Sequence, residues 1–173
     1  MKPFVILLVA MLFVAPVLCM PGQSVTDKDT AGDNKPLPAL KLQDLNGKTI
    51  PADQFKGNII VLDFWATWCV PCIAEIPALN QLQEKYGDKG VQVVGVALAS
   101  GEAAEVKPFV GKNKIKYTIV MGDDDQVYDL NVVGFPTTYL VTRDMKVFRK
   151  YIGAGAKKAA ELEADIKTLL AAR

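Results

Sequence analysis

Residues 61–72, VLDFWATWCVPC, decide the fold, because an apolar run leads there directly into two cysteines that are separated by two residues. Residues 58–64 are almost continuously apolar, which is typical of a strand buried on both faces of a sheet. From residue 71 to residue 86, apolar side chains recur at the three- and four-residue spacing of an amphipathic helix. The cysteines are therefore predicted to lie where a buried strand ends and a helix begins.

A cysteine pair in this position suits thiol–disulfide exchange. A thiolate attacks a disulfide through a mixed-disulfide intermediate, so one sulfur must be exposed and acidic and the other must lie close by. Cys69 would lie at the helix N-terminus, where unpaired N–H groups and the helix dipole stabilise a thiolate. Cys72 would face the same side one turn deeper, and Pro71 suits a first helical turn. We therefore expect an exposed, attacking Cys69 and a deeper, resolving Cys72.

The alternative interpretation of the pair is a static disulfide or two inert buried thiols, but the strand–helix context favours redox chemistry. The 173-residue chain has three cysteines and no histidine, so it offers no Cys–His nucleophile and too few ligands for a usual structural zinc site. No metal and no other cofactor are predicted. A net charge of +1 gives no electrostatic footprint for nucleic acid.

The N-terminus has the pattern of an export signal. Lys2 precedes the apolar run 4–15, which is short compared with the about 20 residues of a membrane-spanning helix, and a polar tract follows. Residues 1–19 are predicted to be a signal peptide, a lipoprotein signal or an uncleaved anchor. Cys19 is a candidate lipidation site, although the bulky Leu18 before it departs from the usual lipobox.

Residues 20–38 are rich in Gly, Ser, Asp, Lys and Pro and are predicted to be a flexible tether to a domain at 39–173. Strands and helices alternate in that domain, which predicts a three-layer α/β/α fold. Asn46-Gly47 predicts an N-terminal β-hairpin, and a tight turn at 143–144 makes the last two strands antiparallel, so the sheet is expected to be mixed. Strands are predicted at 40–42, 49–50, 58–64, 91–98, 117–121, 137–142 and 146–152, and helices at 71–86, 103–112, 124–130 and 156–172.

The stretch 61–72 resembles the active-site strand and loop of thioredoxins. The residues that follow, IAEIP at 73–77, and the additional segment around 99–130 resemble the TlpA/ResA subfamily, whose members are exported and often membrane-tethered thiol–disulfide reductases. The resemblance covers about residue 37 to the C-terminus. It implies a thioredoxin fold with a central βα insertion.

The resemblance also implies roles for single residues. Cys69 matches the nucleophile and Cys72 the resolving cysteine of the family. Pro77 matches a helix-kinking proline, and Pro136 matches the cis-proline opposite the cysteines, beside which an extended client peptide could pair like an added strand. Trp65 is expected in the core. The predicted substrate contacts are Trp68, Val70, Pro71, Phe135, Pro136 and Thr137.

Two acids are candidates for exchanging a proton with Cys72. Asp63 matches the buried carboxylate of thioredoxins, and desolvation at the end of an apolar strand would raise its pKa. Glu75 matches the acid that TlpA/ResA-like proteins carry three residues after the second cysteine. The alternatives are a strand-end Asp63 bonded to nearby backbone and a solvated Glu75 favoured by the helix dipole. ResA-like members usually lack an acid at position 63, so the sequence leaves open which carboxylate acts.

The expected function is therefore reduction of protein disulfides in the bacterial periplasm or at the outer face of the cytoplasmic membrane. Charged Asp63 and Glu75 would oppose a thiolate and make the pair reducing. The expected partners are disulfide-containing protein clients, with cytochrome c maturation suggested by the family alone, and an upstream thiol reductant that is a membrane electron-transfer protein. No nucleic-acid partner is expected.

Two other functions are weighed against this one. A peroxiredoxin-like peroxidase would share the fold, but the required Thr-x-x-Cys spacing is absent from the sequence. A non-enzymatic peptide-binding or holdase module would use the same cleft with a static disulfide. A peroxide turnover assay and an insulin-reduction assay separate these functions from the expected one.

Overall fold

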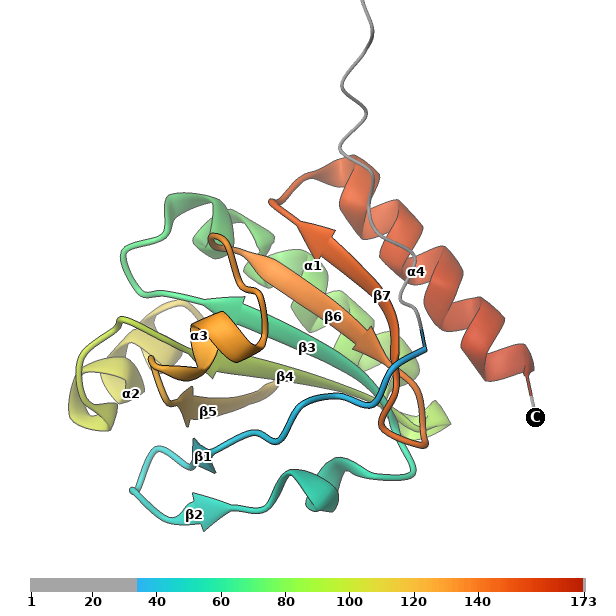
Figure 1. Ribbon diagram of the computed structural model, residues 1–173. Helices are drawn as coiled ribbons and strands as arrows, with labels where there is room; N and C mark the ends of the chain where they lie inside the picture. Colours follow the sequence, from blue (N-terminus) through green and yellow to red (C-terminus); the bar gives the residue numbers. More distant parts are fainter. Residues whose placement is uncertain (1–33, 173) are drawn as a thin grey trace, which may run out of the picture.

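The computed structural model describes residues 34–172 (Figure 1). The predicted export signal, the candidate lipidation site Cys19 and most of the predicted tether therefore lie outside the described residues. Among residues 34–172, no helix combines the length and the apolar character that crossing a membrane requires.

Residues 34–172 form one mixed sheet of seven strands in the order β2-β1-β5-β4-β3-β6-β7. Strands β3, β4 and β5 are parallel to one another, β6 pairs with β3 in antiparallel fashion, and β7 pairs with β6 in antiparallel fashion, as predicted for the last two strands. The strands are β1 (Leu42–Gln43), β2 (Thr49–Ile50), β3 (Ile59–Trp65), β4 (Val91–Ala97), β5 (Thr118–Gly122), β6 (Thr137–Val141) and β7 (Val147–Ile152).

Four α-helices flank this sheet within the described part of the chain: α1 (Val70–Tyr86), α2 (Ala103–Lys112), α3 (Gln126–Asp129) and α4 (Ala156–Ala171). Two 3-10 turns that the sequence analysis did not predict lie at Ala52–Phe55 (η1) and Gly87–Lys89 (η2). Figure 1 shows α3 in front of the sheet and α1 behind it, which gives the expected three layers.

Strand β3 is buried along its whole length, and its side chains alternate between two cores. Ile59, Val61 and Trp65 pack with buried residues of α1, α2 and α4. Ile60, Leu62 and Phe64 pack on the other face. Their partners there are η1, the residues after α3 and the segment before β1. Asp63 stands at the same two-residue spacing as Ile59, Val61 and Trp65, so its side chain points to the face covered by α1 and α4.

The folded domain begins before residue 39, where the sequence analysis ended the tether. The N–H of Leu37 donates to the carbonyl of Met145 at 2.8 Å, and the N–H of Val147 donates to the carbonyl of Lys35 at 2.9 Å. Pro36 forms a bridge with Lys146. The composition of this segment does not reveal the attachment. Backbone groups of an edge strand form these hydrogen bonds, and they require no particular side chains.

Candidate active site

The two cysteines of the sequence motif are joined in a disulfide at the start of α1. Their Cα atoms are 5.3 Å apart. Cys69 is the N-cap of the helix, and its Sγ accepts a hydrogen bond from the backbone N–H of Cys72 at 3.2 Å. A sulfur in this position receives the N–H groups and the positive dipole end that stabilise a thiolate once the disulfide is reduced.

The expectation of an exposed Cys69 and a deeper Cys72 is wrong for this oxidised form, since each residue is only 4% exposed. Both cysteines belong to the core cluster against which Phe135 packs, and the solvent-facing positions beside them are taken by Trp68 and Val70. The difference between the two sulfurs therefore lies in helix position, not in accessible area.

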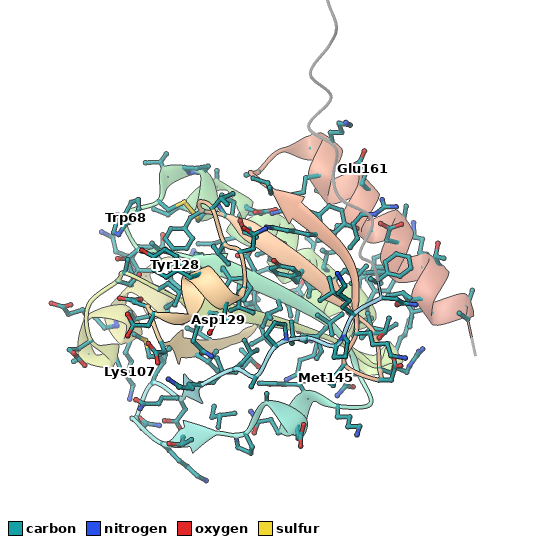
Figure 2. All side chains as sticks on the ribbon, viewed as in Figure 1. Trp68, Lys107, Tyr128, Asp129, Met145 and Glu161 are labelled. Atoms are coloured by element: carbon teal, nitrogen blue, oxygen red, sulfur yellow. A yellow bond between two sulfur atoms is a disulfide. The ribbon has the colours of Figure 1, made fainter. Side chains whose placement is uncertain are left out.

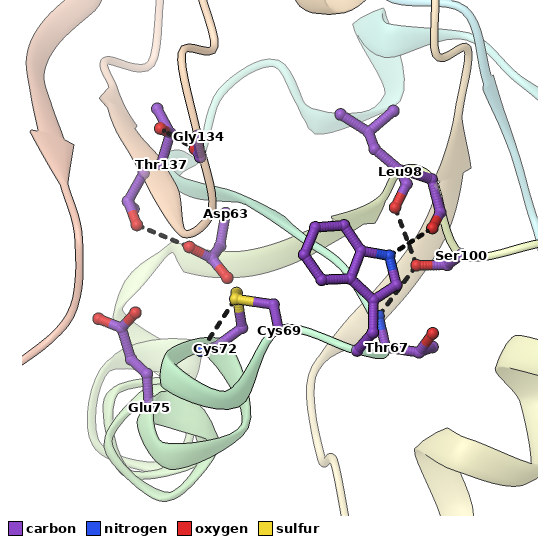
Figure 3. Close-up of a disulfide and its surroundings, with 12 residues drawn as sticks. Asp63, Thr67, Cys69, Cys72, Glu75, Leu98, Ser100, Gly134 and Thr137 are labelled. Atoms are coloured by element: carbon purple, nitrogen blue, oxygen red, sulfur yellow. Dashed lines mark hydrogen bonds between the residues drawn. A yellow bond between two sulfur atoms is a disulfide. The ribbon is translucent and has the colours of Figure 1, made fainter.

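The loop that leads from β3 to the cysteines is held by side chains and backbone of the segment after β4 (Figure 3). The indole N–H of Trp68 donates to the carbonyl of Ala99 at 2.8 Å. The backbone N–H of Thr67 donates to the Ser100 hydroxyl at 3.0 Å. These bonds fix the ring of Trp68 beside the disulfide even though the residue is 64% exposed, whereas Trp65 is buried, as predicted.

The peptide bond between Phe135 and Pro136 is cis, as the family resemblance implied. The Phe135 ring meets the Trp68 ring edge-on at 5.9 Å between centroids. Thr137 is buried and its hydroxyl donates to the carbonyl of Gly134 at 2.7 Å. The structure thus brings Phe135, one of the predicted substrate contacts from the far end of the chain, against the loop that carries the cysteines.

Asp63 is 2% exposed and lies on β3 between Gly95 of β4 and Thr138 of β6. Its carboxylate accepts a hydrogen bond from the Thr138 hydroxyl at 2.7 Å, which is a side-chain partner and not the nearby backbone of the alternative interpretation. Burial raises the pKa of Asp63 to about 7, and the charge of Glu75 adds to this rise while that of Lys158 opposes it. Figure 3 shows the Asp63 side chain directed toward the disulfide.

Glu75 is also buried and is not the solvated acid of the alternative interpretation. Each of its carboxylate oxygens lies 2.9 Å from Nζ of Lys158, a residue of α4 that is 7% exposed. The sequence analysis missed Lys158. The available signal was its spacing, because Lys158 stands four and eight residues before the buried Leu162 and Ile166 and so continues the inner face of α4.

Residues 34–172 contain no group of three or more Cys, Asp, Glu or His side chains that could hold a metal ion. The site brings together three groups of its own that can take part in exchange chemistry. These are a disulfide at a helix N-terminus, a neighbouring carboxyl with a pKa near neutrality, and a buried ion pair one turn further along α1.

Known proteins resemble this chain in sequence and in fold. The model of the Redoxin family matches residues 30–169. The chain is 35% identical over 136 residues to a thiol-disulfide oxidoreductase ResA of Bacillus cereus, covering 78% of each protein. It is 32% identical over 127 residues to ResA of Bacillus subtilis, covering 73% of this chain and 70% of that one.

A solved structure shares the fold over most of the chain. The crystal structure of a putative thiol:disulfide interchange protein DsbE from Chlorobium tepidum matches with a TM-score of 0.73 and 31% sequence identity. The match covers 82% of this chain and 98% of that protein. The α/β class and the thioredoxin fold expected from the sequence are thereby confirmed.

Proposed function

The chain belongs to the Redoxin family and is a thioredoxin-like thiol–disulfide oxidoreductase related to ResA, and from this premise we propose that it reduces the disulfides of protein clients through Cys69 and Cys72. The observation that carries the proposal is the Cys69–Cys72 disulfide at the N-terminus of α1 beside a buried carboxyl group. A static disulfide needs neither a helix N-terminus nor a proton acceptor, so the holdase interpretation leaves both features without a role.

The proposed reaction has two exchange steps. In the reduced protein, the Cys69 thiolate attacks a client disulfide, so that a bond forms between Cys69 Sγ and one client sulfur while the other client sulfur leaves as a thiolate. Cys72 then gives up its proton to a carboxylate and attacks Cys69 Sγ, which releases the client sulfur and restores the Cys69–Cys72 disulfide. Two electrons pass to the client, whose two thiolates take up two protons. An upstream dithiol must then return two electrons to the enzyme.

The direction of electron flow follows from the charges near the cysteines. A strong oxidant requires an unusually stabilised thiolate in its reduced form. Asp63 is a buried acid near this pair, and a negative charge there opposes the thiolate, whereas the charge of Glu75 is paired with Lys158. We expect a reducing potential, well below the about −120 mV of the strong oxidant DsbA. A redox titration of the cysteine pair that gave a midpoint near that value would contradict the proposed direction.

Clients are proposed to dock on the apolar surface around the disulfide. Trp68, Val70 and Val133 are 64%, 74% and 71% exposed, although their side chains are large and apolar. Figure 2 shows Trp68 at the surface beside the start of α1 and Tyr128 on α3, on the same side of the molecule. An extended client segment could lie along Phe135 and Thr137 with its disulfide over Cys69, which suits recognition of backbone with little sequence preference.

The proposed location is the periplasm or the outer face of the cytoplasmic membrane of a bacterium. The apolar run 4–15 after Lys2 supports export, and Cys19 supports a lipid anchor as one form of the mature protein. The proposed upstream donor is a membrane electron-transfer protein, and apocytochrome c or its maturation partners are the proposed clients. The mass of the protein purified from its native host distinguishes a cleaved, a lipidated and an uncleaved N-terminus.

The decisive experiment is a client trap in the native host. Replacing Cys72 with Ser removes the resolving thiol, so a client attacked by Cys69 should remain bound as a mixed disulfide that a reductant releases. Mass spectrometry of the trapped complexes identifies the clients. The matched control is Cys69→Ser, which keeps one thiol but removes the proposed nucleophile and should trap far less.

An insulin-reduction assay of the unaltered protein accompanies the trap. Reduction of insulin by a chemical dithiol should be accelerated, and the acceleration should disappear in Cys69→Ser. The proposal fails if Cys72→Ser captures no protein through Cys69 and the unaltered protein does not accelerate insulin reduction. The peroxidase and holdase interpretations predict that the unaltered protein does not accelerate insulin reduction.

A further inference from the structure

Two buried acids and one buried cation surround the inner side of the disulfide, and their partners differ. Glu75 and Lys158 are 6% and 7% exposed, and Nζ of Lys158 lies 2.9 Å from both carboxylate oxygens of Glu75. Asp63 is 2% exposed, and its hydrogen-bond donor is the neutral Thr138 hydroxyl at 2.7 Å. Lys158 therefore forms an ion pair with Glu75 and not with Asp63.

We propose that Lys158 is a positioning residue that holds Glu75 as a permanent ion pair and thereby leaves the proton exchange with Cys72 to Asp63. The inference rests on the proposed function, since it concerns the proton that the second exchange step requires. It assigns different roles to two acids that the sequence leaves equivalent, and it does so through a residue of α4 that pairs with Glu75.

The physical reason is the free energy of burying charge. A lone buried ion is strongly unfavourable, whereas an ion pair with good geometry is tolerated. Lys158 can satisfy one carboxylate in this way, and the two-oxygen contact shows that Glu75 has that place. Asp63 then has no cation in direct contact and is free to change between its charged and its neutral form during catalysis.

The titratable groups that face Asp63 come from three parts of the chain. Cys72 and Glu75 lie on α1, Lys158 lies on α4, and Tyr117 directly precedes β5. Tyr117 stays neutral, because burial and the charges of Asp63 and Glu75 raise the pKa of its hydroxyl. Burial raises the pKa of Asp63, Lys158 lowers it and Glu75 raises it, so these two charges act on Asp63 with opposite signs.

The orientation of the side chains agrees with this division. In Figure 3 the Asp63 carboxylate points toward the disulfide, and Glu75 lies further along α1. In the second exchange step, the Cys72 thiol passes its proton to the Asp63 carboxylate as Cys72 attacks Cys69 Sγ. The neutral Asp63 later passes that proton to the leaving client thiolate or to water, so the charge of the buried group is restored at the end of the cycle.

The test is a carboxyl titration by ¹³C NMR of the full oxidised chain labelled at Asp and Glu. In the unaltered protein, Asp63 should titrate near neutral pH. In Glu75→Gln its midpoint should fall by about one unit or more, because a charge that raises it is removed and Lys158 loses its partner. In Lys158→Met the midpoint should rise by a similar amount. In the double variant both charges are gone, and the midpoint should return to within about half a unit of the unaltered value.

Two results overturn the proposal. One is an Asp63 carboxyl that does not titrate near neutral pH, and the other is an Asp63 midpoint that Glu75→Gln leaves unchanged. If Lys158→Met does not fold, Glu75→Gln and the double variant still decide, because neither leaves an unpaired buried carboxylate at position 75. The titration uses no client, so its failure is distinct from failure of the insulin-reduction and trapping experiments.

Discussion

Asp63 is a carboxyl group buried in the folded core, where burial disfavours its charged form. It stands on the central strand β3 with apolar residues before and after it, and it is as buried as they are. Removing a carboxylate from water favours its neutral form, which is why its pKa rises to about 7. Chemistry near neutral pH uses such a group, but the folded protein loses stability whenever the group must be charged.

Asp63→Asn is therefore expected to stabilise the oxidised protein. The pKa of Asp63 is higher in the folded than in the unfolded chain, so the folded state binds more protons and stability falls as pH rises from about 4 to about 7. The variant lacks this loss and should be more stable by roughly 2 to 4 kcal/mol above pH 7, with little difference below pH 4. Urea unfolding at pH 4 and at pH 8 measures the difference, and insulin reduction should slow in the same variant.

Asp144→Asn is the matched control for this substitution. Asp144 is exposed, and hydrogen bonds from Lys146 and Thr142 lower its pKa to about 2. The folded state then binds fewer protons than the unfolded chain, so the same substitution there should slightly lower stability above pH 4. An Asp63→Asn protein that gained no more stability at pH 8 than at pH 4 would contradict the assignment of a raised pKa.

Single residues differed in how well the sequence revealed them. The spacing of Cys69 and Cys72 after an apolar strand was sufficient to find the disulfide and its helix position. The partnership of Glu75 with Lys158 could not be predicted, because the two residues are 83 positions apart and only the packing of α4 on α1 joins them. The sequence analysis missed Lys158, and its spacing from Leu162 and Ile166 indicates the inner face of its helix but no partner.

Elements with strong local determinants were predicted closely. Helix α2 occupies the predicted range, since Glu102 and Glu105 form a capping box at its start. The continuously apolar strands β3 and β4 were predicted to within one residue at each end. The 3-10 turns η1 and η2 were missed because such short turns carry no periodicity. Pairing of β1 with β5 joins residues about 80 positions apart, which no local pattern encodes.

Strand β4 provides the test at this scale, because Gly95 leaves room there for side chains of the core. A Cβ at Gly95 would lie 2.6 Å from Cδ1 of Ile119 and 2.9 Å from Nε1 of Trp65. Gly95→Ala should therefore force the side chains of Ile119 and Trp65 to move and destabilise the protein by about 1 to 3 kcal/mol. Thermal unfolding followed by circular dichroism measures the loss.

The same substitution on helix α2 is the control for β4. No atom lies within 4 Å of a Cβ built at Gly111, which is exposed. Gly111→Ala adds helix propensity without a clash and should stabilise by about 0.5 to 1 kcal/mol. If both substitutions shifted stability in the same direction, close packing around Gly95 would not be the cause.

On the scale of the whole molecule, the segment before β1 connects the edge strand β7 with β1, which is next to the opposite edge of the sheet. In Figure 1 it runs from the β6–β7 turn across the face of the sheet to β1. Two backbone hydrogen bonds, one to Met145 and one from Val147, hold its start. Gln126 of α3 holds its end next to β1, accepting from the N–H of Lys41 and donating to the carbonyl of Ala39, each at 2.7 Å. The thin third layer of the fold therefore depends on this segment as well as on α3.

Removing the start of that segment should weaken the whole domain. A chain that begins at residue 39 lacks the hydrogen bonds at Lys35 and Leu37 and the packing of Leu37 on the second core, which a chain that begins at residue 34 keeps. Two lost hydrogen bonds and one partly buried apolar side chain correspond to about 2 to 3 kcal/mol. Urea unfolding of the two chains measures the difference, and Leu37→Ala in the longer chain separates the packing contribution from that of the hydrogen bonds.

Because the cysteines lie on the face covered by α1 and α4, insulin reduction by the shorter chain should be unchanged under conditions where it is folded. Equal stability of the two chains would mean that residues 35–38 rest on the sheet without supporting it, as a tether would.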